Sequence, residues 1–298
     1  MSTDARRRYA SAAFITLLIL SLSWPSPIVS ANRLWLDRDL AVDELSFLGR
    51  EAPSWDVVFF CLAGLLALAI LQSGEVRDWR ATLRRSIAWN PGALCRRPAR
   101  WAAAALAGAL AVALTWFLLD APVLAWAERI RSDTTQALVR GINRFGGGMN
   151  PPMIVLFFAV AGVAYRTPRW IRYAAAMALA ALGAGAVAHI LKFLVGRARP
   201  ELWLGPFHYA RGAANSFPSG HTVGAFALAG VLLFASKSLP LRIIALLLAV
   251  AAGLARILAF RHWTSDVVAS ALLGLMAAWV AVRVLSAPPP AADGRPRG

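Results

Sequence analysis

Long apolar runs are the feature that most restricts what this chain can fold into. Hydrophobic residues make up 59% of its 298 residues, and only 15% are charged. A helix that spans a bilayer needs about 20 consecutive apolar residues. The runs that approach this length lie at residues 11–29, 55–72, 101–119, 151–166, 173–192, 219–236, 241–260 and 266–285. The expected fold class is therefore an all-α integral membrane protein.

The first run has two interpretations. Arg6 to Arg8 form a positive region ahead of the apolar stretch from Phe14 to Leu22, and Val29-Ser30-Ala31 resembles a signal-peptidase site. The segment is therefore either a cleaved signal or an uncleaved anchor. Both alternatives leave residue 32 on the outer side of the membrane.

The net charge of +16, from 31 Lys and Arg against 15 Asp and Glu, does not indicate a nucleic acid partner here. Most of the excess lies between apolar runs, where membrane topology and acidic headgroups account for it. The two cysteines are Cys61, in an apolar run, and Cys95, in a basic loop. They are expected to lie at different depths, so we expect neither a disulfide nor a metal site.

Three cations stand near the ends of apolar runs. Lys192, Arg199 and Arg256 would be costly at membrane depth without a partner or a function. Arg presents a planar fork to two phosphate oxygens, and Lys adds a mobile charge, so together they could neutralise a phosphoryl group. Snorkelling to the headgroups is the alternative for these three, and it is equally open for Arg197 and Arg261.

The segment Pro218-Ser219-Gly220-His221 predicts the start of a helix. Ser219 offers a hydroxyl and an exposed amide, and Gly220 lets the backbone come close to a ligand. Free amides and the positive end of the helix dipole make an anion site, beside which His221 is placed for proton transfer. The alternative is a plain helix start with a buried, hydrogen-bonded histidine.

His262 and Asp266 are four residues apart. If a helix begins near Trp263, the carboxylate lies over the turn that His262 enters. A carboxylate on one ring nitrogen would fix the tautomer and make the other nitrogen a better nucleophile or base. The alternative is an interfacial His–Asp pair that only holds a turn.

Taken together, these residues resemble the signature of the type 2 phosphatidic acid phosphatase superfamily. The matching residues, in order and with the family's internal spacing, are Lys192, Arg199-Pro200, Pro218-Ser219-Gly220-His221, Arg256, His262 and Asp266. Ala255 departs from the family, because many members have Ser there. The resemblance covers about residues 100–285 and implies a six-helix core. About two extra N-terminal transmembrane segments lie outside it.

The resemblance implies a role for each matching residue. His262 would form a phosphohistidine, Asp266 would orient it, and His221 would protonate the leaving group. The residues that would hold the phosphoryl oxygens are Lys192, Arg199, Ser219, Gly220 and Arg256. Neither a metal nor a cofactor is implied, since members of the family need no metal and no carboxylate cluster accompanies the motifs.

The implied activity is that of a membrane lipid phosphatase that hydrolyses a phosphomonoester or diphosphate lipid. The candidate substrates are undecaprenyl diphosphate, phosphatidylglycerol phosphate, phosphatidic acid and lipid A, and analogy does not choose among them. A lipid phosphotransferase with the same phosphohistidine and a non-catalytic lipid-binding or transport protein are the alternatives. A vanadium haloperoxidase shares the anion pocket, but the hydropathy of this chain argues against that soluble class. The motifs do not indicate an oligomeric state.

Basic residues in the short loops predict the orientation. Residues 73–100 and 166–172, with Lys237 and Arg242, are expected in the cytoplasm, which places all three motifs on the periplasmic side of a bacterial inner membrane. The basic segment 120–150 opposes this and is interpreted as an interfacial helix that caps the site. The expected divisions are N-terminal membrane segments with a basic cytoplasmic loop at 1–100, the core at 101–285 and a disordered tail at 286–298.

Overall fold

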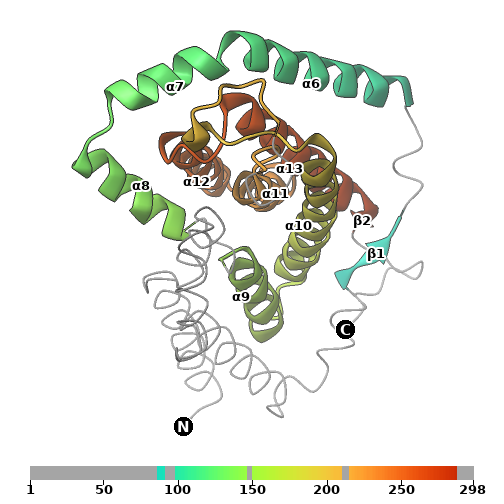
Figure 1. The fold of residues 1–298 in the computed structure, drawn as a ribbon. Helices are drawn as coiled ribbons and strands as arrows, with labels where there is room; N and C mark the ends of the chain where they lie inside the picture. Colours follow the sequence, from blue (N-terminus) through green and yellow to red (C-terminus); the bar gives the residue numbers. More distant parts are fainter. Residues whose placement is uncertain (1–85, 91–97, 146–149, 210–214, 287–298) are drawn as a thin grey trace, which may run out of the picture.

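The computed structural model describes residues 86–90, 98–145, 150–209 and 215–286, and this part of the chain is almost wholly helical. The helices are α6 (Pro98–Leu118), α7 (Asp120–Arg129), α8 (Asp133–Phe145), α9 (Asn150–Ala164), α10 (Pro168–Val195), the 3-10 helix η3 (Pro200–Leu202), α11 (Gly220–Ala235), α12 (Leu239–Leu258) and α13 (Thr264–Val284) (Figure 1). Two short strands, β1 (Ala88–Trp89) and β2 (Leu285–Ser286), pair antiparallel. The predicted all-α class is confirmed.

The helix α11 lies inside a bundle formed with α10, α12 and α13 (Figure 1). It packs most extensively against α13, and α9 packs against α10. In Figure 1 the helices α6, α7 and α8 form an arc along the outside of this bundle. The six predicted spans of the core correspond to α6 and to α9 through α13, with ends that differ by a few residues.

Small residues allow α11 and α13 to approach backbone to backbone. A Cβ added at Gly274 of α13 would lie 2.7 Å from the carbonyl oxygen of Val223 and 2.8 Å from the amide nitrogen of Ala227. Ala278, on the same face of α13, is fully buried in the core. Close contact through small side chains is the usual way in which membrane helices associate, because lipid gives them no hydrophobic reason to do so.

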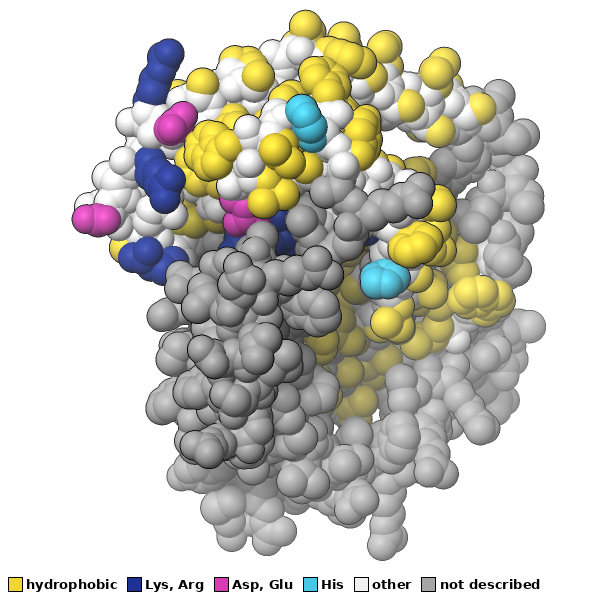
Figure 2. Space-filling model, in the orientation of Figure 1, with side chains coloured by type: hydrophobic (Ala, Val, Ile, Leu, Met, Phe, Trp, Pro, Cys, Tyr) yellow, Lys and Arg dark blue, Asp and Glu magenta, His cyan; other side chains and the backbone are white. Residues whose placement is uncertain are grey.

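The lengths and surfaces of the helices fit a bilayer. By length and composition α10, α12 and α13 are each able to cross a membrane, and α6 with α7 forms a fourth candidate that bends by 54° at its break. Apolar side chains cover the outside of α6, where Leu106 is 72% exposed (Figure 2). The predicted spans at 11–29 and 55–72 lie outside the described residues, so the division at residue 100 stays a prediction.

The basic segment 120–150 contains two helices where one was expected. Ser132 ends the connection after α7, and its hydroxyl accepts a hydrogen bond from the Thr135 amide (3.1 Å) at the start of α8. Such a cap satisfies a free amide of the first turn and starts a new helix. The side chain of Gln136 donates to the carbonyl of Leu258 (3.2 Å), which fixes α8 against the end of α12.

We expect Gly274→Ala to destabilise the bundle. The Cβ of the new alanine would clash with backbone atoms of α11, which can move only if the whole helix shifts. Overpacking of this kind typically costs about 1–3 kcal/mol. The matched control is Gly183→Ala in α10, whose Cβ would meet nothing within 4 Å. Thermal unfolding of both variants in detergent checks this, and equal midpoints would contradict the close packing.

Candidate active site

The loop that follows α10 joins the three motifs at one end of the bundle. The Ser216 amide donates to the carbonyl of Arg197 (2.6 Å), and the Glu201 amide donates to the carbonyl of Phe260 (3.0 Å). The first bond ties the segment before α11 to the segment after α10. The second ties that segment to the turn between α12 and α13. Three stretches far apart in sequence therefore meet here, as the topology predicts.

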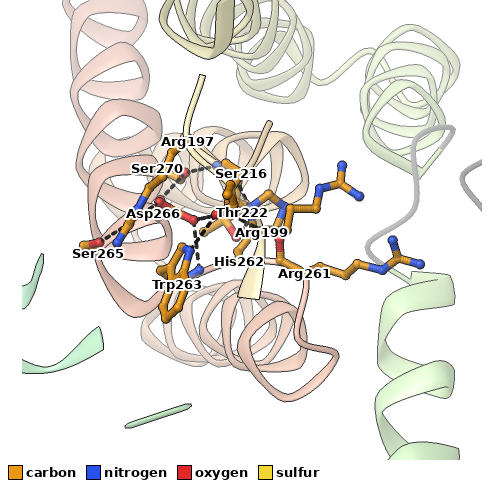
Figure 3. Close-up of polar contacts among 12 residues, drawn as sticks. Arg197, Arg199, Ser216, Thr222, Arg261, His262, Trp263, Ser265, Asp266 and Ser270 are labelled. Atoms are coloured by element: carbon orange, nitrogen blue, oxygen red, sulfur yellow. Dashed lines mark hydrogen bonds and ion pairs between the residues drawn. The ribbon is translucent and has the colours of Figure 1, made fainter. Parts of the chain in front are cut away.

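His262 is 3% exposed and has one ring nitrogen in a close hydrogen bond. Its Nδ1 atom lies 2.7 Å from the backbone carbonyl oxygen of Ser216 (Figure 3). A carbonyl oxygen can only accept, so Nδ1 carries the hydrogen and Nε2 keeps its lone pair. The motif spacing predicts that Asp266 orients the imidazole, but its Oδ2 atom lies 3.8 Å from Nδ1, further than the Ser216 carbonyl. The Ser216 hydroxyl bridges them by donating to the Asp266 carboxylate.

Burial lowers the pKa of the His262 imidazole well below its usual value. The positive charges of Arg256, Lys192 and Arg199 lower that pKa further, and the hydrogen bond to Ser216 opposes them only in part. His262 is therefore neutral at neutral pH, and its free nitrogen is available as a nucleophile. All three predicted cations are therefore close enough to the His262 imidazole to act on its charge.

Asp266 also starts the helix α13. Its Oδ2 atom accepts a hydrogen bond from the Trp263 amide (2.8 Å), and the helix begins at Thr264. This confirms the predicted helix start near Trp263. The carboxylate thus satisfies a free amide of the first turn, where negative charge is favoured by the helix dipole.

The three cations keep donors that no protein group uses. Arg199 and Arg256 each bury an Nε atom with no hydrogen-bond partner within the described chain. Arg256 donates from Nη1 to the side chain of Asn143 in α8 (3.2 Å), and Arg199 makes only a long contact of 3.5 Å with Glu201. Buried donors without partners are costly. An anion with several acceptor oxygens would satisfy them, and the half-buried Lys192 would add charge.

The start of α11 differs in two details from the prediction. Pro218 precedes the helix instead of lying in its first turn, since Ser219 is the N-cap and the helix begins at Gly220. The amide of Ser219 is not exposed, because it donates to the Ser270 hydroxyl (2.7 Å), and Ser219 itself is fully buried. Within the described chain the amides of Gly220 and His221 have no such acceptor. A Cβ at Gly220 would meet no atom within 4 Å, so this residue leaves open space beside the amides. His221 is close enough to interact electrostatically with His262.

Comparisons with known proteins identify the family. The model of the PAP2 superfamily matches residues 170–288. A lipid A 1-phosphatase from Rhizobium johnstonii is 30% identical over 214 residues, which cover 66% of this chain and 84% of that protein. A lipid A 1-phosphatase from Rhizobium etli is 32% identical over 195 residues, which cover 59% of this chain and 82% of that protein.

The chain belongs to the PAP2 superfamily. The resemblance seen in the motifs is thereby confirmed, and the protein is a phosphatase that acts on lipid phosphates, not a non-catalytic binding protein. The crystal structure of a transmembrane PAP2-type phosphatidylglycerolphosphate phosphatase from Bacillus subtilis has the same fold. It superposes with a TM-score of 0.50 at 23% identity and covers 60% of this chain and 92% of that one.

The PAP2 site depends on a buried arginine, Arg197, for which the sequence leaves snorkelling open. Arg197 has no exposed surface. Its guanidinium lies 2.6 Å from Asp120 and 2.8 Å from Asp266, and it also donates to the Ser265 hydroxyl (2.7 Å) and the Pro206 carbonyl (2.9 Å). Arg197 therefore does not snorkel, because each of its three nitrogens has a protein acceptor.

Two indole rings enclose the same guanidinium. The Arg197 Cζ atom lies 3.9 Å from the ring centre of Trp116 and 5.1 Å from that of Trp263. Planar guanidinium groups stack well on aromatic faces, and the attraction increases when the pair is desolvated. Since Trp116 comes from α6 and Trp263 precedes α13, the stack joins the outer arc to the bundle.

Motif spacing missed four residues that shape the PAP2 site: Asp120, Asn143, Arg197 and Ser216. One signal for Asp120 was available, because it is the first carboxylate after the apolar run 101–119 and a charge at that depth needs a partner. No spacing rule links it to Arg197, which lies 77 residues further along the chain.

We expect Asp120→Ala to lower the free energy of unfolding by about 3–5 kcal/mol, since it removes one partner of a buried charge. The Ser265 amide and hydroxyl would also lose their acceptor. Glu128→Ala, at an exposed carboxylate of the same helix, is the control. Thermal unfolding in detergent measures both variants. If Asp120→Ala unfolds at the same temperature as the parent, the ion pairs do not stabilise the fold.

Proposed function

We propose that this PAP2 phosphatase removes the 1-phosphate of lipid A through a phosphohistidine at His262. The observation that carries the reaction is the buried imidazole of His262, whose Nδ1 atom bonds to the Ser216 carbonyl and leaves Nε2 available. The charges of Lys192, Arg199 and Arg256 act on the same ring. Phosphoryl transfer needs little more than a positioned nucleophile and positive charge around the transferred group, because charge spreads over the phosphoryl oxygens.

The proposed first step is an in-line displacement. His221 enters this step protonated, because the anionic phosphate beside it stabilises the imidazolium. His262 attacks phosphorus through Nε2, the bond from phosphorus to the lipid oxygen breaks, and His221 gives that oxygen its proton. The oxygens of the phosphoryl group are held by the three cations and by the amides of Gly220 and His221. Negative charge at these amides is favoured by the helix dipole of α11.

The second step regenerates the enzyme. A water molecule gives its proton to His221 and attacks the phosphohistidine, so that the bond from Nε2 to phosphorus breaks and inorganic phosphate leaves. The Ser216 carbonyl supports the imidazole at Nδ1 throughout. Asp266 stabilises its positive charge through the Ser216 hydroxyl, so we assign Asp266 a supporting role.

The substrate assignment comes from the relatives. Both Rhizobium proteins are named lipid A 1-phosphatase, and this chain covers more than four-fifths of each, 84% and 82%. A 1-phosphate is a phosphomonoester at the anomeric carbon of a sugar, and its hydrolysis releases inorganic phosphate. That chemistry suits a site with one nucleophile, three nearby cations and a proton donor.

We place the site on the periplasmic side of the bacterial inner membrane. Residues Arg166, Arg169 and Arg172 lie at the start of α10, whereas Lys192 and the motif loops lie at its other end. The positive-inside rule puts the first group in the cytoplasm and the site in the periplasm. The basic segment 120–150 lies on the same side as the site and opposes this orientation. One of its cations has a partner within the protein, since the Arg131 guanidinium lies over the Phe260 ring (5.2 Å).

The substrate proposal is tested by assaying phosphate release from a panel of lipids in the presence of EDTA. Lipid A should give the highest kcat/KM, and mass spectrometry of the product should place the loss at the 1-position. The other panel members are phosphatidic acid, phosphatidylglycerol phosphate and undecaprenyl diphosphate. A higher kcat/KM for one of these would reassign the substrate. Transfer of the phosphate to a second lipid would instead identify a phosphotransferase.

The nucleophile is tested by His262→Ala, which should leave less than about 1% of the parent activity, because loss of a nucleophile costs several orders of magnitude. His208→Ala is the control, since His208 is an exposed histidine in the loop after η3. Alkaline quench of the parent during turnover should trap an acid-labile phosphohistidine. A phosphorylated His262→Ala protein would assign the nucleophile elsewhere.

Sidedness is tested by cysteine labelling after Cys61 and Cys95 are replaced. Leu204→Cys lies in the loop after η3, and Ser238→Cys lies at the opposite end of the bundle; both positions are exposed. An impermeant maleimide should label residue 204 in spheroplasts and residue 238 only after lysis. The reverse pattern would place the chemistry in the cytoplasm.

A further inference from the structure

A second cavity lies at the end of the bundle away from His262. It has a volume of about 410 Å³ and is lined by Arg169, Arg172, Tyr173, Ala176, Ala235, Lys237, Val282 and Leu285. These residues come from the start of α10, the end of α11 and the end of α13. Arg169 and Lys192 are 23 residues apart in α10, which at 1.5 Å per residue separates the cavity from the catalytic cations by about 35 Å.

The residues that line this cavity give it a positive charge that no lining carboxylate neutralises. Arg169, Arg172 and Lys237 contribute three cations, and no carboxylate of the described chain lines it. Arg172 donates to the backbone carbonyl of Ser86 (3.3 Å), a neutral acceptor that leaves its charge intact. The ends of α11 and α13 bring only about half a negative charge each. The cavity therefore favours an anion.

The rest of the lining is apolar and held in place. Ala176, Val282 and Leu285 form its wall, and the Tyr173 hydroxyl donates to the carbonyl of Ala235 (3.2 Å), which fixes α10 against the end of α11. Cations above an apolar wall at the ends of spanning helices match an amphiphile whose phosphate lies at headgroup depth. Basic pockets between membrane helices bind anionic headgroups in this way.

We propose that this cavity binds the phosphate headgroup of an acidic glycerophospholipid in the leaflet opposite the active site. The positive-inside rule alone accounts for basic loops, but it requires neither a cavity nor cations gathered on its rim. The bound lipid would stabilise the junction of α10, α11 and α13. The proposal concerns a binding site separate from the catalytic residues and does not depend on the substrate assigned above.

The experiment measures lipid retention by native mass spectrometry after exchange into nanodiscs of phosphatidylcholine with one-third phosphatidylglycerol. The parent should retain phosphatidylglycerol over phosphatidylcholine. The triple variant Arg169→Gln/Arg172→Gln/Lys237→Gln should lose at least about tenfold of that preference. Arg283→Gln is the matched control, because Arg283 is an exposed arginine in the last turn of α13 that does not line the cavity. It should retain the lipid like the parent.

Two further measurements separate this proposal from folding and from catalysis. The triple variant should keep phosphate release in detergent, which shows that it folds. Arg199→Gln, altered at the catalytic end, should keep the lipid preference. Undiminished preference in the triple variant would overturn the proposal, and so would an equal loss in Arg283→Gln, which would indicate general surface charge. A preference lost in Arg199→Gln but kept in the triple variant would place the lipid in the catalytic site.

Discussion

Arg197 lies between Asp120 and Asp266 with no exposed surface on any of the three side chains. Removing a charge from water costs several kcal/mol even after relaxation, and an ion pair offsets this only when its hydrogen bonds are complete. Here they nearly are, because Ser265 and the Pro206 carbonyl accept from two further donors, so that four of the five N–H groups of the guanidinium are bonded. Asp120 belongs to the break between α6 and α7, so this one cluster fixes the outer arc of helices to the bundle.

The same cluster sets the position of the nucleophile. Asp266 is held by Arg197 at one oxygen and, at the other, by the Trp263 amide and the Ser216 hydroxyl. Ser216 in turn holds His262 through its carbonyl. The imidazole is therefore oriented by a chain of contacts that begins outside the family's motifs. Catalytic geometry that is fixed in this way before the substrate binds needs little reorganisation during the reaction.

The charges of the site also balance around a phosphate. Arg197 with its two carboxylates leaves one negative charge, and Glu201 pairs with Arg261 at 2.9 Å. Lys192, Arg199 and Arg256 then leave a net charge of about +2 beside His262. A phosphate monoester carries −1.5 to −2 near neutral pH, so the bound substrate offsets most of this positive charge and favours the additional proton on His221. Arg256 also donates a hydrogen bond to the side chain of Asn143 in α8.

The sequence alone was enough to predict the membrane class, the six core helices, the family and the meeting of three motifs at one end. Each of these follows from local information: run length, the helix start signal at Pro218-Ser219, and the spacing of residues within each motif. It was not enough to predict the partner of Arg197 or the carbonyl that orients His262. Both contacts join residues more than 40 apart, 77 and 46 positions. Only the packing of α11 against α13, through Gly274, and the bend after α6 bring such residues together.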